Sequence, residues 1–193
     1  MADLVLAAFM SLDGFMEGPE GFVPPAWSDD LEVHWSGETL ARAGHLVYGR
    51  KNFTFNTDFW LDETGPAAEI AYADRMNGLP KTVLSTTLPD APGWNATVLR
   101  DMDALAARIA ELKRADKGQN GGDVIALGGA ELSQSLIAAD LPDEYKILLT
   151  PDLFGGGKKL FGTGGPRLAL ELVETRALDT GATILRYRRR RGA

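Results

Sequence analysis

The sequence predicts an α/β protein with a largely parallel central sheet, helices on both faces and an antiparallel hairpin at the C-terminal end. Short apolar runs of strand length alternate with segments of helix length along most of the chain. Strands that alternate with helices form a parallel sheet, which is buried on both faces. The last two strand-like runs, 170–177 and 183–188, are joined by Asp179-Thr180-Gly181, a turn sequence typical of a β-hairpin.

The first elements follow from apolar runs and from helix start signals. Uninterrupted apolar residues predict a buried strand at 4–10, and glycines and prolines make 11–25 a loop. A helix is predicted over 28–42, because its first residue is a serine that can cap it and two aspartates follow in the first turn. A second strand is predicted at 45–48.

The middle of the chain is read in the same way. The aromatic segment 53–60 is predicted to be irregular. A helix is predicted over 66–77, since proline lies in its first turn and glycine follows its end. Apolar and β-branched residues predict strands at 81–86 and 97–99.

The later elements are a helix, a loop and a strand–turn–helix unit. An apolar stripe predicts a helix over 104–114, and glycines and polar residues predict a loop over 117–123. A strand at 124–127 then meets two glycines and a helix over 131–141. The last parallel strand is predicted at 145–150, and the glycine-rich loop behind it is expected to be mobile.

Length and charge limit the classes of function. A single domain over 1–193 is predicted, because no linker divides a chain of this length. The net charge of −7 argues against general nucleic-acid binding, which needs a basic surface. Arginines gather only at 186–191, where a solvated strand end is a commoner interpretation than a tail for acidic partners.

The composition also limits the chemistry and the compartment. The chain has no cysteine, which excludes disulfides and thiolate catalysis. Its two histidines are not paired at metal-ligand spacing, so we expect no metal site. We expect a cytoplasmic protein without a membrane segment, because no secretory signal is evident and no apolar run approaches the roughly 20 residues that span a bilayer.

Two segments favour a phosphorylated cofactor. Gly128-Gly129-Ala130-Glu131 joins a strand to a helix, whose free N–H groups and dipole favour an anion. Tyr48-Gly49-Arg50-Lys51 places two cations after another strand. Each segment also has a plainer interpretation, as a tight β-to-α turn and as a surface ion pair. Neither the dinucleotide fingerprint nor a Walker loop is complete.

Four short motifs lie where predicted strands end: Ser11-Leu12-Asp13-Gly14, Tyr48-Gly49-Arg50, Ser85-Thr86-Thr87 and Gly128-Gly129-Ala130-Glu131-Leu132. Their order resembles that of the dihydrofolate reductase-like superfamily, and most closely the branch that contains the C-terminal reductase domain of bacterial riboflavin biosynthesis. The resemblance covers nearly the whole chain. It implies a dihydrofolate reductase-like fold, NADPH as the cofactor and, as is usual in the riboflavin branch, a homodimer.

The resemblance assigns roles that suit the chemistry of the residues. Gly128 and Gly129 would let the backbone contact the pyrophosphate, with Ala130 and Glu131 in the first helical turn. Arg50 and Lys51, after Gly49, would bind the 2′-phosphate that distinguishes NADPH from NADH. Ser85 and Thr86 would donate hydrogen bonds to that phosphate or to the ribose, or else they form an ordinary strand end.

The loop 11–25 corresponds to the loop that closes over the nicotinamide in this superfamily, although an ordinary surface loop is the alternative. Asp13 either braces this loop or bonds a polar substrate. Asp30 is the next candidate acid, although acids in a first helical turn are usually caps. Dihydrofolate reductases carry a single carboxylate on the first helix that binds the pteridine, and no acid on this helix matches its position cleanly. Basic residues that would bind a ribose phosphate, as in the riboflavin enzyme, are not evident near the first loop.

We therefore expect an NADPH-dependent reductase that transfers a hydride to a pteridine- or pyrimidine-like heterocycle. Hydride transfer requires alignment of cofactor and acceptor more than a catalytic dyad. The alternative is a noncatalytic NADPH-binding or regulatory module of the same fold. The aromatic residues of 53–60 discriminate between the two, because they line a substrate site in a reductase and fill the core or a dimer contact in a binding module.

Overall fold

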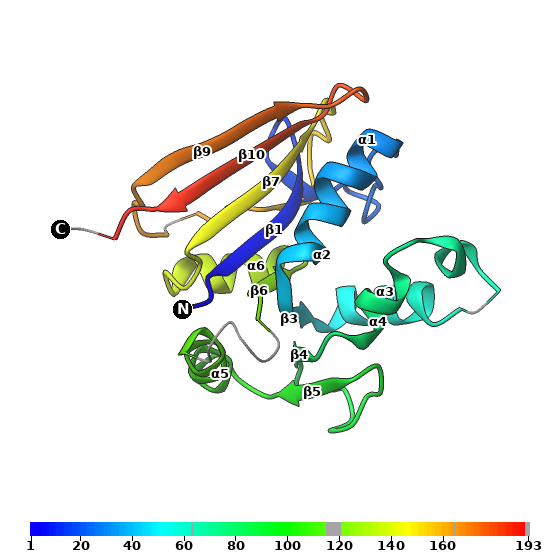
Figure 1. Ribbon diagram of the computed structural model, residues 1–193. Helices are drawn as coiled ribbons and strands as arrows, with labels where there is room; N and C mark the ends of the chain where they lie inside the picture. Colours follow the sequence, from blue (N-terminus) through cyan, green and yellow to red (C-terminus); the bar gives the residue numbers. More distant parts are fainter. Residues whose placement is uncertain (63, 115–120, 164, 192–193) are drawn as a thin grey trace.

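The computed structural model describes residues 1–62, 64–114, 121–163 and 165–191 (Figure 1). An eight-stranded sheet has the strand order β5-β4-β3-β6-β1-β7-β10-β9, and a separate pair joins β2 to β8. The six strands from β5 to β7 are parallel, whereas β10 runs antiparallel to β7 and to β9. The predicted α/β class, with a largely parallel sheet and an antiparallel C-terminal hairpin, is confirmed.

The strands are β1 (Leu4–Ser11), β2 (Phe15–Glu17), β3 (Ala43–Gly49), β4 (Lys81–Leu84), β5 (Ala96–Leu99), β6 (Asp123–Leu127), β7 (Glu144–Thr150), β8 (Lys158–Lys159), β9 (Leu170–Ala177) and β10 (Thr183–Arg189). The helices are α1 (Asp29–Leu31), the π-helix η1 (Glu32–Gly37), α2 (Glu38–Arg42), α3 (Arg50–Trp60), the 3-10 helix η2 (Pro66–Glu69), α4 (Ala73–Gly78), α5 (Met102–Arg114) and α6 (Ala130–Ala138).

Helices cover both faces of the sheet because each central strand alternates its apolar side chains between two cores. Val5 and Ala7 of β1 pack on the face that carries α1, η1, α2, α3 and α4. Leu4 and Leu6 pack on the opposite face, under α5 and α6. In Figure 1 the α1–α2 stretch lies in front of β1 and α6 lies behind it.

Four local predictions were wrong or incomplete. Residues 53–60 belong to helix α3, although their aromatic and β-branched side chains have low helix propensity. Burial of Phe53 and side-chain bonds back along the helix, such as Thr57 Oγ1 to Phe53 O, overcome that propensity. The helix predicted over 66–77 is divided, because Ile70 is extended between η2 and α4.

The helix predicted over 28–42 begins as expected, since the Ser28 hydroxyl accepts a hydrogen bond from the Leu31 N–H. Its middle is a π-helix, η1, which the sequence pattern does not reveal. The loop predicted at 11–25 contains the short strand β2, which pairs with β8 just beyond the glycine-rich loop after β7. Part of the loop predicted at 117–123 lies outside the described residues.

A group of buried charges lies at the amino edge of the sheet. Glu144, at the start of β7, has no exposed surface and accepts hydrogen bonds from Arg42 and Arg186. Burial acts to raise the pKa of this carboxyl, but the two guanidinium groups act more strongly, so the pKa lies below its usual value. Glu144 is therefore an ionised carboxylate that holds α2 and β10 to β7.

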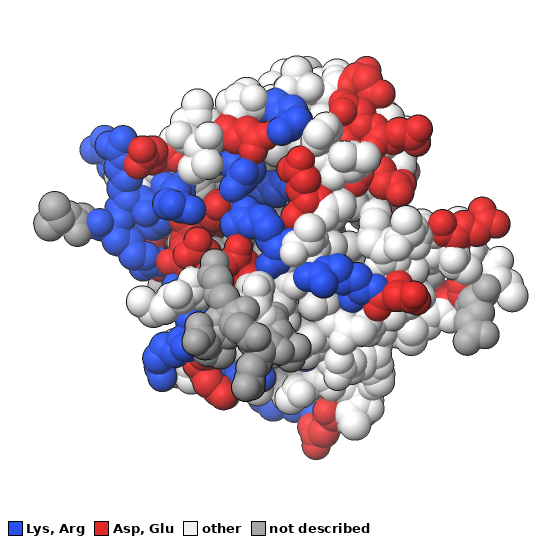
Figure 2. All heavy atoms as spheres, viewed as in Figure 1, with Lys and Arg blue, Asp and Glu red and all other residues white. Residues whose placement is uncertain are grey.

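The arginines of 186–191 pair with carboxylates of the same chain. Arg189 binds Asp140, Arg190 lies near Glu171, and Arg191 contacts Asp143. Figure 2 shows basic and acidic side chains interleaved on the side where the chain ends. The basic run is thus a strand end whose charges are balanced locally.

Glu144→Gln should lower the free energy of unfolding at neutral pH by about 3 kcal/mol, because two partly buried arginines lose their shared carboxylate. Glu171→Gln is the matched control, since that exposed pair with Arg190 contributes no more than about 1 kcal/mol. Urea unfolding at several pH values measures both.

The pH dependence follows from the lowered pKa of Glu144. A carboxyl whose pKa is lower in the folded protein than in the unfolded protein stabilises the fold at a pH above its unfolded pKa. This stabilisation is lost as the pH falls through the folded pKa. The gap between unmodified and Glu144→Gln protein should therefore close in acid; a gap that stays constant with pH would contradict this account.

Candidate functional site

Two helices begin beside one another at the carboxyl edge of the sheet. Helix α3 follows β3 directly, helix α6 follows β6 after two glycines, and β3 and β6 are neighbours in the sheet. The N-cap residues are Gly49 and Gly129, and neither helix has a side-chain hydrogen bond at its cap. The first N–H groups of an α-helix have no partner within the helix. Both helices therefore direct main-chain donors and positive dipole ends to the same edge, an arrangement suited to an anion.

The two helix starts are packed against each other. A Cβ atom added to Gly49 would lie 3.4 Å from Cβ of Leu132, in the first turn of α6. The Asn52 amide of α3 donates a hydrogen bond to the carbonyl oxygen of Leu127, at the end of β6. The relative position of the two N-termini is therefore fixed before any ligand binds.

The two glycines of the β6–α6 turn have different constraints. Gly129 has φ −75° and ψ 174°, a backbone conformation that residues other than glycine also adopt. A Cβ on Gly129 would make only an ordinary contact, 3.8 Å from Oε1 of Glu17. A Cβ on Gly128 would lie 2.8 Å from Oγ of the buried Ser133. Packing thus disfavours a side chain at 128, whereas Gly129 leaves room for a group approaching the helix.

Charged side chains surround these helix starts. Arg50 and Lys51 are exposed in the first turn of α3, where cations are unfavourable for the helix dipole. Among the described residues, neither forms an ion pair with a carboxylate. Glu131 instead binds Lys158 of β8 at 2.6 Å, and this hydrogen bond is the main cause of the lowered pKa of the Glu131 carboxyl. The charges of Lys51 and Arg50 also act to lower the pKa of Glu131, so the three residues lie in one electrostatic environment.

Lys158 is a residue that the sequence reasoning missed. It also lies 4.0 Å from Glu17, on the loop predicted to close over the site. The sequence signal for it is weak: two lysines directly after the Gly155-Gly156-Gly157 run. With Arg50 and Lys51 it forms the basic trio of the site.

Ser85 and Thr86 lie at the carboxyl end of β4, next to β3. The buried Ser85 hydroxyl oxygen accepts hydrogen bonds from the N–H groups of Thr87 and Leu88. Ser85 thus shapes the turn after the strand, and its own hydroxyl proton is not used in these two bonds. Thr86 is exposed at the same edge.

Asp13 joins the first loop to the loop after β7. Its Oδ1 accepts hydrogen bonds from Ser11 Oγ and Phe154 N, and its Oδ2 accepts one from Gly155 N. The bond from Ser11 is the main cause of a lowered pKa of the Asp13 carboxyl. Asparagine could not reproduce these bonds, since one of its two atoms is a donor. The glycine-rich loop expected to be mobile is therefore held by an ionised aspartate.

Asp30 lies elsewhere, at the start of the first helix. Its Oδ2 accepts a hydrogen bond from Asp179 N in the β9–β10 turn, and His34 lies 3.4 Å from its Oδ1. The carboxyl is 34% exposed. Asp13 and Asp30 thus tie two different parts of the chain, and no contact joins them.

A row of aromatic rings lies beside the loop that carries Glu17. Its members, which we call the aromatic row, are Trp35, Phe9, Phe22 and Phe55. Neighbouring rings in that order have centroids 5.1, 6.2 and 6.0 Å apart. Phe22 and Phe55 are 48% and 59% exposed, so flat ring surface faces solvent.

The aromatic segment 53–60 contributes only Phe55 to this row. Phe53 is buried against Tyr48 and Trp94, and Trp60 packs on Tyr72. Phe9, Phe22 and Trp35 come from other parts of the chain, and no local pattern groups them.

Comparison with known proteins identifies the family. The family model for the RibD C-terminal domain matches residues 2–184. The chain belongs to the RibD C-terminal domain family. The resemblance to the riboflavin-biosynthesis branch of the dihydrofolate reductase-like superfamily is thereby confirmed, and RibD C-terminal domains are of the reductase type.

Individual relatives agree with membership of the RibD C-terminal domain family. The chain is 27% identical to the uncharacterised protein YyaP of Bacillus subtilis over 185 residues, which cover 95% of this chain and 93% of YyaP. A putative riboflavin biosynthesis protein from Shewanella sp. PV-4 has the same fold, with a TM-score of 0.74, 22% identity, and 98% and 99% of the two chains covered.

Acinetobacter baumannii RibD has the same fold at 18% identity, with a TM-score of 0.67. That match covers 98% of this chain and 58% of the Acinetobacter chain, so this chain spans a little over half of that protein. Within the described residues, no group of acidic or histidine side chains could hold a metal ion, and none of the described helices has the length and apolar character needed to cross a bilayer.

The contrast between the two glycines can be tested through stability. Gly128→Ala should lower the free energy of unfolding by about 1–3 kcal/mol, because the new methyl group overlaps the Ser133 hydroxyl. Gly129→Ala should change it by no more than about 0.5 kcal/mol, since its backbone angles suit alanine and space is available. Urea unfolding of the two variants measures the difference. Equal losses in both would show that Ser133 can move away.

Proposed function

We propose that the protein is an NADPH-dependent reductase that acts on a pyrimidine- or pteridine-like heterocycle. The observation that carries the proposal is the pair of uncapped helix N-termini at Gly49 and Gly129, with Arg50 and Lys51 exposed beside them. Cations at a helix start oppose the dipole, so they are better explained by an anionic ligand than by helix stability.

The main-chain and basic groups at the carboxyl edge of the sheet would bind two different parts of NADPH, the pyrophosphate and the 2′-phosphate. The N–H groups of Ala130 and Glu131 would bind the pyrophosphate, and Gly129 would let it approach. Arg50 and Lys51 would bind the 2′-phosphate, because a guanidinium can donate two parallel hydrogen bonds to phosphate oxygens. Lys158, which pairs with Glu131 at 2.6 Å, would offset the repulsion between the Glu131 carboxylate and the phosphates.

When bound, NADPH would supply the hydride, and the chain would align the acceptor and exclude water. The exposed rings of the aromatic row suit a flat conjugated acceptor, since aromatic rings stack favourably. Asp13 is an ionised carboxylate with three donors on it, so we assign it the bracing of the first loop. Asp30 is tied to the β9–β10 turn. We therefore assign the proton of the reaction to water.

The substrate class is supported by the family. A Thermotoga maritima protein that shares the fold, at 13% identity and a TM-score of 0.66, is described as a diaminohydroxyphosphoribosylaminopyrimidine deaminase and 5-amino-6-(5-phosphoribosylamino)uracil reductase. A substituted uracil is a flat heterocycle of the size of one aromatic ring. We therefore place pyrimidines first among the acceptors to be tried.

The cofactor preference gives the first functional test. NADPH should bind at least about tenfold more tightly than NADH, since charge-assisted hydrogen bonds contribute roughly 1.5–3 kcal/mol each. Arg50→Ala should remove most of this preference and leave NADH affinity nearly unchanged. Arg114→Ala, an exposed arginine at the far end of α5, is the control and should keep the preference. Tryptophan fluorescence titrations measure all affinities. Equal binding of both cofactors to the unmodified protein would refute the assignment.

Turnover separates the reductase from a noncatalytic NADPH-binding module. A screen of uracil derivatives and pteridines, followed by the loss of reduced-nicotinamide absorbance, should find oxidation of NADPH that depends on the acceptor. Tight NADPH binding without turnover of any of these heterocycles would favour the noncatalytic module.

We also propose that the protein is a homodimer that pairs through the edge of the sheet formed by β9. This edge strand exposes Leu170, Leu172 and Val173. Exposed apolar residues on a sheet edge are a template for association, and two-fold dimers are the commonest oligomers.

Leu172→Asp should convert the dimer to a monomer, because a charge would be buried in a contact between identical surfaces. Sedimentation analysis measures the mass. Leu61→Asp is the control, since that exposed leucine lies after α3 and away from β9. Sedimentation of the unmodified protein as a monomer would refute the proposed homodimer.

A further inference from the structure

The π-helical turn η1 accepts hydrogen bonds from a lysine that lies outside the helix. π-helical turns are rare and are frequent at functional sites. Here the ammonium group of Lys146, from the middle of β7, donates to the carbonyl oxygens of His34 and Trp35, at 2.8 and 3.2 Å. Its third hydrogen bond, at 2.8 Å, goes to Oγ1 of Thr39, whose own hydroxyl donates to Trp35 O. All three donors of the ammonium are thus directed at one turn of helix.

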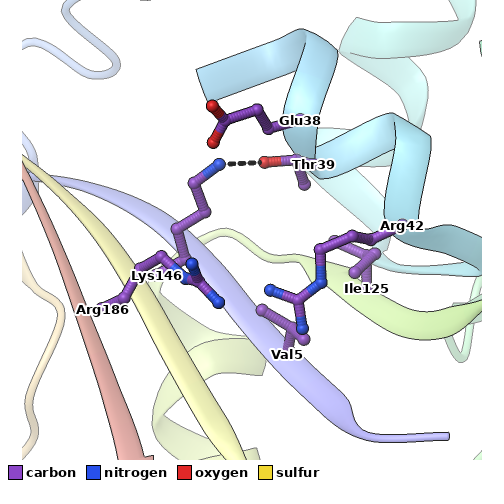
Figure 3. A pocket seen from close by; sticks show the side chains of 7 residues that line it. All are labelled: Val5, Glu38, Thr39, Arg42, Ile125, Lys146 and Arg186. Carbon is purple, nitrogen blue, oxygen red and sulfur yellow. Dashed lines mark hydrogen bonds between the residues drawn. The ribbon is translucent and has the colours of Figure 1, made fainter. Parts of the chain in front are cut away.

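Lys146 is only 3% exposed and lies beneath η1, beside a cavity of about 20 Å³. Figure 3 shows its side chain rising from the sheet to Thr39, with Arg186 beside it and Arg42 on the opposite side. The Nζ atom also lies 5.3 Å from the ring centre of Trp35, within the range of a cation–π interaction. Lys146 therefore contacts both the backbone and the ring of Trp35.

Trp35 is in turn the base of the aromatic row. It is buried, and its ring packs against Phe9 at 5.1 Å. Phe9 contacts Phe22, and Phe22 contacts Phe55. A shift of Trp35 would therefore move the ring against which the exposed part of the row is packed.

We propose that Lys146 is a positioning residue for the acceptor. Its hydrogen bonds hold η1 in one conformation, so that the Trp35 ring supports the aromatic row in a fixed position. This inference rests on the proposed reductase function, because the aromatic row is the proposed acceptor surface. Lys146 does not touch substrate or cofactor, and it acts through Trp35.

The chain contains a matched control for this role. Lys81, at the start of β4, donates to the carbonyl oxygens of Met76, Asn77 and Leu79, and it lies 4.2 Å from the ring centre of Trp94. Burial lowers the pKa of each lysine to about 8. Trp94, however, packs against the buried rings of Tyr48 and Phe53, and within the described residues none of its ring contacts is with a member of the aromatic row. The two lysines have the same chemistry, but only Lys146 connects to the aromatic row.

The test compares Lys146→Met with Lys81→Met. Each variant removes the three hydrogen bonds that its ammonium donates, so both should lose stability to a similar degree. Only Lys146→Met should raise the KM for the acceptor, by roughly tenfold, because a small misplacement of a binding surface is costly. NADPH affinity should stay unchanged in both. Amide hydrogen exchange over 32–39 should become faster in Lys146→Met than in Lys81→Met.

Thr39→Val is the second variant, for the case that Lys146→Met does not fold. It keeps the lysine and removes one acceptor, and it should raise the acceptor KM and the exchange rate over 32–39 in the same direction. Equal exchange over 32–39 in the two lysine variants would overturn the proposal, as would an unchanged acceptor KM in Lys146→Met. Failure of the unmodified protein to turn over any acceptor would instead refute the reductase function, and the exchange measurement would still decide whether Lys146 fixes η1.

Discussion

The six parallel strands must end at one edge of the sheet, and this constraint places every group of the candidate site. A helix that follows a parallel strand has to start at that edge and return along the face of the sheet. Helix α3 follows Gly49 directly, and α6 follows only two glycines after β6. Because both N-cap residues are glycines, which have no capping side chain, both starts present bare main-chain N–H groups. The same edge receives Asp13 after β1 and the Gly155–Lys158 loop after β7, so two further loops meet there.

The opposite edge has the reverse character. Where strands begin, Arg42 pairs with both Asp123 and Glu144, and Arg186 from β10 pairs with Glu144 as well. Charges at the amino edge are matched within the chain, whereas Arg50 and Lys51 at the carboxyl edge lack a carboxylate partner among the described residues. The protein thus separates ion pairs that hold elements together from cations that are available to a ligand.

The fold and part of the site could be predicted from sequence because their signals are local. The order of strands and helices, and the glycine turn before α6, depend on a few adjacent residues. The helical state of 53–60 depends on burial of Phe53, which no local pattern shows. The bonds of Asp13 to Phe154 and Gly155 span more than 140 positions.

The aromatic row and the π-helical turn were beyond prediction for the same reason. Phe9, Phe22, Trp35 and Phe55 are scattered along the chain and meet only after the sheet has formed. The widening of η1 is accompanied by hydrogen bonds from Lys146, which lies on a strand more than 100 residues away. Local propensity carries no information about such a partner.

The central place of β1 has a consequence for how the chain acquires its structure. Strand β1 is made before its partners β6 and β7, and its flanking contacts reach Asp123 and Asp143, 120 and 139 positions away. Contacts of such high sequence separation are slow to form, because a long loop must close first. A nascent chain that ends before β6 contains neither neighbour of β1. Its apolar residues must therefore stay shielded by other means, such as chaperones, through most of synthesis.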